Sequence, residues 1–194
     1  MRFPRAYELC VENAKAKRDF GRFYGPATGL PLGSGLLISD CVLAFANESE
    51  KRYQTGTGPA LILTHECDID QANARHFNDL FLAFPIISLD DFCDEFEAEH
   101  GPESWAAFLP ALVKDDVVRA MWIPPVPDSS KCPELQGGGV IYLNQLSHSR
   151  VEWVTDIEKQ AICTLSSFGL RYFDAKIGNL WNREKAVPLP LFRS

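Results

Sequence analysis

The stretch that decides the fold is residues 59–79, which read PALILTHECDIDQANARHFND. Its first part, residues 59–64, is an apolar run without polar alternation, and this pattern predicts a short central strand that is covered on both faces. Two His, one Cys and several acidic residues follow directly after it. Side chains just past the end of a central strand are held firmly and still meet solvent, so this segment is the candidate functional region.

Apolar runs on both sides of this stretch predict further strands. Residues 35–45 are expected to form one strand, bent at Ser39-Asp40, and the polar residues 47–58 to form a turn. Residues 80–87 predict another strand, in which Pro85 indicates an edge position or a bulge. Later runs predict strands at 117–123, 140–146 and 151–154, with a turn at 147–150.

Helices are expected between and around these strands. Residues 88–101 predict an acidic helix that begins at the N-cap Ser88 and stops at Gly101. A second helix is expected over 104–114, interrupted at Pro110. Residues 5–20 have a helical apolar face, and an apolar stripe from Leu165 to Trp181 predicts a terminal helix that packs against the sheet.

Short strands with interposed helices predict an α+β fold, built as a small, partly open β-barrel of about five or six strands. The acidic helix is an insertion and a helix closes the chain. The length of 194 residues fits a single domain over 1–194. Its expected parts are an N-terminal helix within 1–22, the barrel with its inserted helices over 33–164, and a C-terminal helix over 165–185.

Charge is concentrated in one part of the chain. The formal net charge is −7, and residues 66–100 hold ten acidic residues against Arg75 alone, or −9. The rest of the chain therefore sums to +2. Such a segment repels polyanions, so we expect no sequence-independent binding to duplex DNA and favour a protein or small-ligand partner over nucleic acid.

The compartment follows from what the sequence lacks. The first twenty residues hold no apolar signal-peptide core, and no run approaches the roughly 18 apolar residues of a membrane span. The six cysteines are widely spaced and form no CxxC pair. We therefore expect a cytoplasmic protein with reduced thiols, no membrane partner and no cofactor.

Three interpretations of residues 64–79 stay open. In the first, His65, Cys67 and His76 bind a metal ion, although their spacing matches no standard site. In the second, Cys67 is a nucleophile, with His65 or His76 as its base and Asp68 as the orienting acid, although acidic surroundings disfavour a thiolate. In the third, Cys67 is a buried structural residue and Asp68 fixes the following turn.

The structural interpretation makes the sharpest statement about Asp68. Its carboxylate is expected to be partly buried and to accept hydrogen bonds from the backbone of residues 69–71. Substituting Asp68 by Ala should then reduce stability, whereas substituting Cys67 by Ser should be mild. The residues expected to contact a ligand at this strand end are Thr64, Asp70 and Arg75.

The apolar strand followed by Thr64-His-Glu-Cys-Asp-Ile69 resembles the strand-Ser/Thr-x-x-Cys-Asp signature of a family of small, uncharacterised bacterial proteins. Cys67-Asp68 is the most specific part, and His65-Glu66 departs from the usual spacer. Over residues 33–190, further similar segments follow in the family's order at 121–125, 140–146, 163–167, 180–183 and 188–190. The resemblance implies architecture and no particular activity.

The strand order also resembles, more distantly, the MazF/PemK-like toxin barrel, with residues 58–64 in the position of its second strand. That family carries an Arg before the proline and uses it to contact phosphate, whereas Gly58 precedes Pro59 here.

These patterns lead to two candidate functions. One is a non-catalytic binding or interaction module that acts through the strand end at 64–79 and the acidic helix. The alternative is a MazF/PemK-like endoribonuclease, a toxin or defence component.

Overall fold

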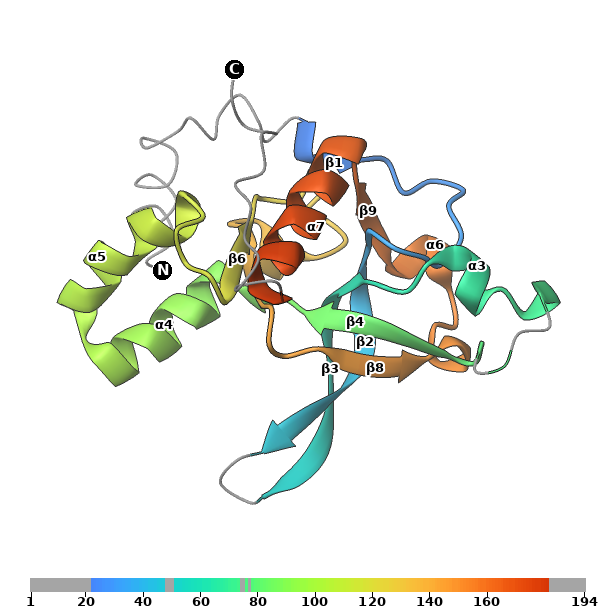
Figure 1. The fold of residues 1–194 in the computed structure, drawn as a ribbon, viewed down its shortest axis with the longest axis horizontal. Coiled ribbons are helices and arrows are strands. Elements are labelled where there is room, and N and C mark those ends of the chain that lie inside the picture. The colour runs from blue at the N-terminus through green and yellow to red at the C-terminus, as the bar shows by residue number, and fades with distance from the viewer. Residues whose placement is uncertain (1–21, 48–50, 74–75, 77, 182–194) are drawn as a thin grey trace.

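The computed structural model describes residues 22–47, 51–73, 76 and 78–181, so the helix expected at 5–20 lies outside the described residues. Its strands form two antiparallel sheets. The first sheet contains β1 (Tyr24–Gly25), β2 (Leu36–Asn47), β3 (Arg52–Ile62), β4 (Leu80–Pro85), β8 (Ser147–Arg150) and β9 (Ala161–Leu165). The second contains β5 (Ile87–Ser88), β6 (Ala120–Ile123) and β7 (Gly139–Tyr142). The strand orders are β1-β9-β2-β3-β4-β8 and β5-β7-β6 (Figure 1).

The described α-helices are α3 (Glu66–Ile69), α4 (Leu89–His100), α5 (Pro102–Val113), α6 (Ile157–Gln160) and α7 (Ser167–Trp181). Short 3₁₀ helices cover Gln71–Asn73, Pro133–Leu135 and Val151–Trp153. None of the helices in the described part of the chain has the length and apolar character that a membrane span requires.

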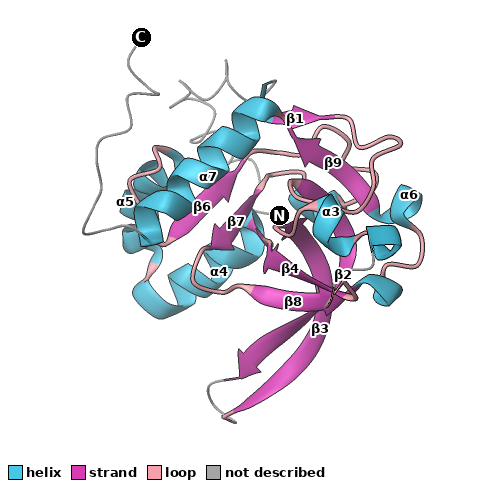
Figure 2. Cartoon of the chain, turned by 45° about the vertical axis from the view of Figure 1, so that its right-hand side comes forward, coloured by secondary structure: helices cyan, strands magenta, loops and turns pink. Residues whose placement is uncertain are grey.

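The long hairpin of β2 and β3 supplies the centre of the larger sheet. The two strands pair from Leu37↔Leu61 to Asn47↔Arg52, with a register shift between Ile38 and Cys41 that confirms the expected bend. The prediction of a turn over 47–58 is wrong. Residues 52–58 belong to β3, and this part of the strand lies in an arm that extends away from the rest of the sheet (Figure 2). The arm's β3 half is mostly exposed and has no apolar face, so its sequence resembles a turn.

The central position expected for residues 59–64 is confirmed, because the inner half of β3 pairs with β2 on one side and β4 on the other. The strand expected over 80–87 is divided between the sheets: β4 ends at Pro85 and β5 starts at Ile87. Pro85 is the last residue of β4, where its missing N–H removes no ladder bond within the strand. The chain therefore crosses from one sheet to the other with a single residue between the two strands.

The turn expected over 147–150 is a strand, β8, and the strand expected over 151–154 begins with a 3₁₀ helix. In β8 the side chains of Ser147 and Ser149 are buried and those of His148 and Arg150 are exposed. The alternation is that of a half-buried strand, but its inward residues are serines, so the apolar signal is missing.

Ser147 connects β8 to the free edge of β2. Its hydroxyl accepts a hydrogen bond from the Ala44 N–H at 2.9 Å and donates one to the Ala44 carbonyl at 3.0 Å. The two antiparallel sheets and the helices between their strands confirm the α+β class. No closed barrel forms among the described strands.

The acidic helix expected over 88–101 is confirmed as α4. The Ser88 hydroxyl accepts from the Asp91 N–H at 3.1 Å, and the C-cap Gly101 has a positive φ of 82° that favours glycine. The interruption expected at Pro110 is wrong, because α5 continues to Val113. Burial of Trp105, Leu109 and Leu112, worth about 1.5–3 kcal/mol each, outweighs the roughly 3 kcal/mol that an interior proline costs.

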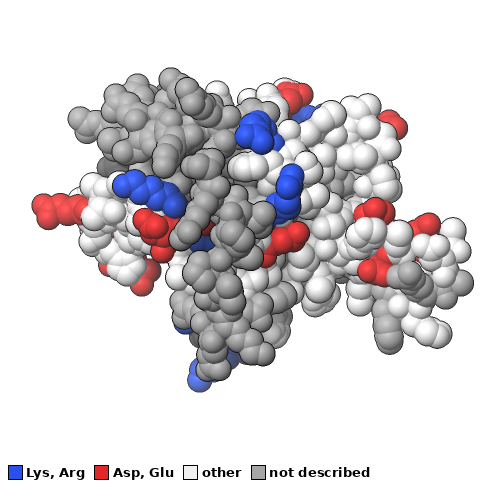
Figure 3. Space-filling view, turned by 45° about the horizontal axis from the view of Figure 1, so that its top comes forward, with Lys and Arg blue, Asp and Glu red and all other residues white. Residues whose placement is uncertain are grey.

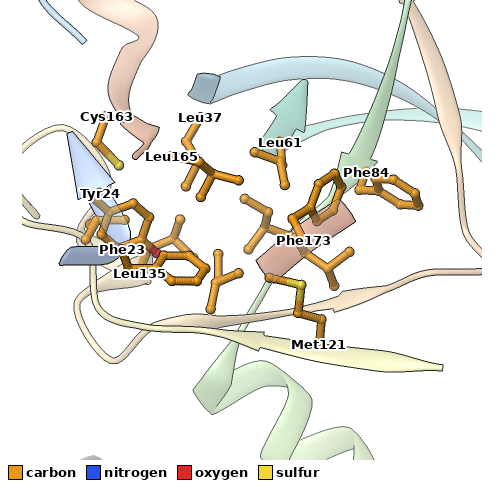
Figure 4. Packing of buried hydrophobic residues seen from close by; sticks show 14 of the residues in the cluster. Phe23, Tyr24, Leu37, Leu61, Phe84, Met121, Leu135, Cys163, Leu165 and Phe173 are labelled. Carbon is orange, nitrogen blue, oxygen red and sulfur yellow. The ribbon is translucent and has the colours of Figure 1, made fainter. Parts of the chain in front are cut away.

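The main core lies between the two sheets and is covered by α7 (Figure 4). Phe84 of β4 and Phe173 of α7 meet edge-to-face at 5.7 Å, with Met121 of β6 in the same cluster. Phe173 and Ile177 are buried, which confirms that the terminal helix packs against the sheet. Leu165, expected in this helix, belongs instead to β9.

The buried side chain of Lys176 forms an ion pair that holds α7 in place. The Lys176 side chain is only 5% exposed, and its ammonium lies 2.5 Å from the Asp115 carboxylate. It also donates to the backbone carbonyls of Asp115 at 3.0 Å and Val117 at 2.6 Å. Asp115 has a φ of 66°, a left-handed conformation that Asp and Asn tolerate better than most residues. The contacts fasten α7 to the connection between α5 and β6.

We expect Lys176→Met to lower the free energy of unfolding by about 2–4 kcal/mol, since it removes the ammonium group that the Asp115 carboxylate and two carbonyls bind. Lys176→Met combined with Asp115→Asn should recover part of this loss, because Asn is uncharged and tolerates the same φ. Urea denaturation of the full chain measures both.

The matched control is Lys159→Met, which removes a lysine from an exposed pair with Asp156. This control should leave the denaturation midpoint unchanged. Equal losses in Lys176→Met and Lys159→Met would contradict the anchoring role of Lys176.

Candidate functional site

The segment from Thr64 to Asp79 connects β3 to β4 and contains α3. Its start is fixed to the sheet, because the Leu82 N–H donates to the Thr64 hydroxyl at 2.7 Å and the Leu63 N–H donates to the Leu82 carbonyl at 2.9 Å. Gly33 lies against the first residue of α3: a Cβ added to Gly33 would be 2.8 Å from the Cβ of Glu66. Glycine at this position therefore permits the close approach of the loop before β2.

Side chains of the segment form the turns around α3. The Nδ1 atom of His65, the N-cap residue, accepts from the Cys67 N–H at 3.3 Å. The carboxylate of Asp70 accepts from the Ala72 N–H at 2.9 Å, and the Asn73 side chain donates to the Cys67 carbonyl at 3.0 Å. The backbone geometry after β3 thus depends on His65, Asp70 and Asn73.

The structure corrects two expectations about the central pair. The structural interpretation, one of the three left open, expects a buried Cys67 and a partly buried Asp68, but both residues are exposed. The reason is local: Ile69 is the residue that α3 buries, and the other residues of this short helix face outward.

The remaining candidates are placed as follows. His76 is exposed, Thr64 contacts β4, and Arg75 lies outside the described residues. With Nδ1 engaged at the cap, His65 keeps Nε2, which lies 3.5 Å from the Glu66 carboxylate. Within the described residues, no three His, Cys, Asp or Glu side chains are grouped so that they could hold a metal ion.

Cys67 differs from the other described cysteines in its exposure. Cys41, Cys93, Cys132 and Cys163 are buried. Burial is the main cause that raises the pKa of the Cys41 thiol to about 11 and that of Cys163 to about 12. These four thiols are core residues, whereas Cys67 meets solvent.

Sequence reasoning missed the surface beside this segment. On the outer face of β4, Leu80 is 36% exposed and Leu82 is 43% exposed. Their partners on β8 are Arg150 and His148, which are also exposed. The apolar run at 80–87 gave no signal of this face, because both faces of β4 carry apolar residues. The backbone N–H of Leu82 donates to the Thr64 hydroxyl, so this strand lies beside the start of the segment.

The charge around this surface is mainly acidic. Glu66, Asp68, Asp70 and Asp79 belong to the segment, and Arg150 at its border lies 3.6 Å from Asp79. On the face shown in Figure 3, acidic side chains lie toward both ends of the molecule, and Lys and Arg side chains form no continuous patch among the described residues.

A second feature that sequence reasoning missed is a pocket of about 240 Å³ at the other end of the molecule, between α4, α5 and the β6–β7 pair. It is lined by aromatic rings and by charged residues of α4. The sequence showed the apolar face of α4, but the pocket joins residues from elements far apart in the chain.

Comparisons with known proteins do not extend this description: no protein-family model matches the chain, and no curated protein matches it. The resemblance to the bacterial family with the Cys-Asp signature stays a prediction.

We expect Cys67 to react with iodoacetamide in the native protein, while Cys41, Cys132 and Cys163 react only after denaturant is added, because burial excludes the reagent and raises their pKa values. Peptide mass spectrometry after timed alkylation measures this. Cys67→Ser should leave the melting temperature unchanged. Protection of Cys67 equal to that of Cys163 would contradict the exposed position.

Proposed function

We propose that this protein is a non-catalytic interaction module that binds a protein partner through the segment 64–79 and the adjoining outer face of β4. The observation that carries the proposal is the pair of exposed leucines, Leu80 and Leu82, next to a loop with fixed turns. Single exposed apolar residues are ordinary, but two on one face of one strand beside an ordered polar loop are typical of a contact surface.

The partner's chemistry follows from the charges. Carboxylates at Glu66, Asp68, Asp70 and Asp79 belong to the segment, and Asp79 directly precedes Leu80. A complementary partner segment therefore carries apolar side chains together with Lys or Arg. The proposal includes a cytoplasmic setting, as the sequence predicts.

We also infer that the larger sheet acts as one partly open barrel. Ser147 supports this inference, because its hydroxyl makes the two hydrogen bonds with Ala44 that a neighbouring strand would otherwise make. Curvature of this kind brings β8 beside β2 and holds the outer face of β4 in a fixed orientation next to the loop.

The alternative is a MazF/PemK-like endoribonuclease, which the curved antiparallel sheet supports. Two observations oppose it: Gly58 precedes Pro59, and His65 Nδ1 accepts a hydrogen bond from the Cys67 N–H.

Incubating single-stranded RNA with the full chain distinguishes the two functions. Cleavage that is lost in His76→Ala and in Cys67→Ser would establish the alternative and exclude the proposed module.

We expect the full chain to select peptides with neighbouring apolar and basic residues from a phage-displayed library of random peptides. Leu82→Lys should abolish this selection, since it removes the apolar contact and repels a basic partner. Tyr53→Lys is the matched control, because Tyr53 is 80% exposed and lies on the distant β2–β3 arm.

Melting temperatures of both variants should equal that of the unmodified protein, because both side chains face solvent. Selection that survives Leu82→Lys, or that Tyr53→Lys abolishes equally, would exclude this surface.

A further inference from the structure

The pocket between α4, α5 and the β6–β7 pair has walls of aromatic rings. Phe96 of α4 and Phe108 of α5 are stacked, with centroids 4.5 Å apart and an interplanar angle of 25°. Phe92 contacts Phe108 at 6.0 Å and Tyr142 of β7 at 5.6 Å. Phe96, Phe108 and Tyr142 are partly exposed, so their rings meet the open space of the pocket.

The rim of the pocket on α4 is negative. Glu95 and Glu99 line it, and because they are one helical turn apart they lie on the same face of α4. Burial and then the charges of these two glutamates raise the pKa of the Tyr142 hydroxyl.

The other polar side chains that line the pocket are His100 and Arg119. His100 lies 3.6 Å from Glu99 and packs edge-on against Phe96 at 4.6 Å. Arg119 is exposed and comes from the segment just before β6. Since α4 carries six acidic residues, the potential on the helix side of the pocket favours a cation.

We propose that this pocket binds one cationic side chain, Lys or Arg, of a basic peptide segment in a protein partner. Aromatic faces attract ammonium and guanidinium groups, and the two glutamates at the rim complement their charge. The volume of about 240 Å³ lies below the roughly 300–1,000 Å³ of sites that enclose whole small molecules, so it suits a single side chain.

This site goes beyond the interaction module proposed above, because it uses a different surface. The pocket lies at the end of the molecule with α4 and α5, and the segment with α3 lies at the opposite end (Figure 1). An experiment can therefore disprove binding at one site without disproving binding at the other.

The test is fluorescence anisotropy of the full chain with a labelled peptide, Gly-Ala-Lys-Arg-Ala-Gly, and with a second peptide in which Gln replaces Lys and Arg. We expect saturable binding of the basic peptide only. Glu95→Gln combined with Glu99→Gln should weaken it about tenfold, and Phe96→Leu, which keeps the apolar bulk and removes the ring, several-fold.

The matched control is Asp90→Asn combined with Asp94→Asn, which changes the charge of α4 equally at exposed positions that do not line the pocket. It should leave the affinity within twofold. An equal loss in this control would show unspecific attraction and overturn the proposal.

The proposal is also overturned if the unmodified chain binds the basic peptide no better than the Gln peptide. This holds even if the reason is that the chain's own basic segments occupy the pocket. Leu82→Lys should not change this affinity, which separates the outcome from that of the segment 64–79.

Discussion

A buried ammonium group determines how the two halves of the core meet. Lys176 can be buried only because Asp115 and two carbonyls satisfy it, and these acceptors exist only where α5 turns into β6. The position of α7 is thereby fixed relative to the smaller sheet. Phe173 and Ile177 of the same helix fill the core, where residues of both sheets meet. A hydrogen bond between β1 and the residue after β6 supports this arrangement: the Tyr24 hydroxyl donates to the Pro124 carbonyl at 2.6 Å.

The parts of the fold that the sequence predicts are those in which local and tertiary signals agree. Helix α4 has a capping serine, a terminal glycine and an apolar stripe, and the inner half of β3 is apolar on both faces. The failures occur where one signal is missing. The outer half of β3 has no buried face, and β8 turns serines inward, so neither has the apolar pattern of a strand. In α5, tertiary burial outweighs the local effect of Pro110.

The sequence places a polar connection directly after a central strand, and the structure has one there. The sequence did not predict that His65 caps α3, because this depends on which backbone N–H groups point toward each side chain, and residue types alone do not specify this. The pocket at α4 could not be predicted, since Phe96, Phe108 and Tyr142 come together only through the packing of two helices on the smaller sheet.

The hydroxyl of Ser147 has a consequence for the protein's behaviour in concentrated solution. Strand β2 pairs with β3 as far as Asn47 but with β9 only at Leu36–Ile38, so its backbone near Ala44 would otherwise be an open sheet edge. Open edges recruit strands from other chains and lead to aggregation or domain swapping. By occupying both the N–H and the carbonyl of Ala44, one small side chain denies a foreign strand its attachment point. An apolar side chain at position 147 has no donor or acceptor and would leave the Ala44 backbone groups open to such pairing.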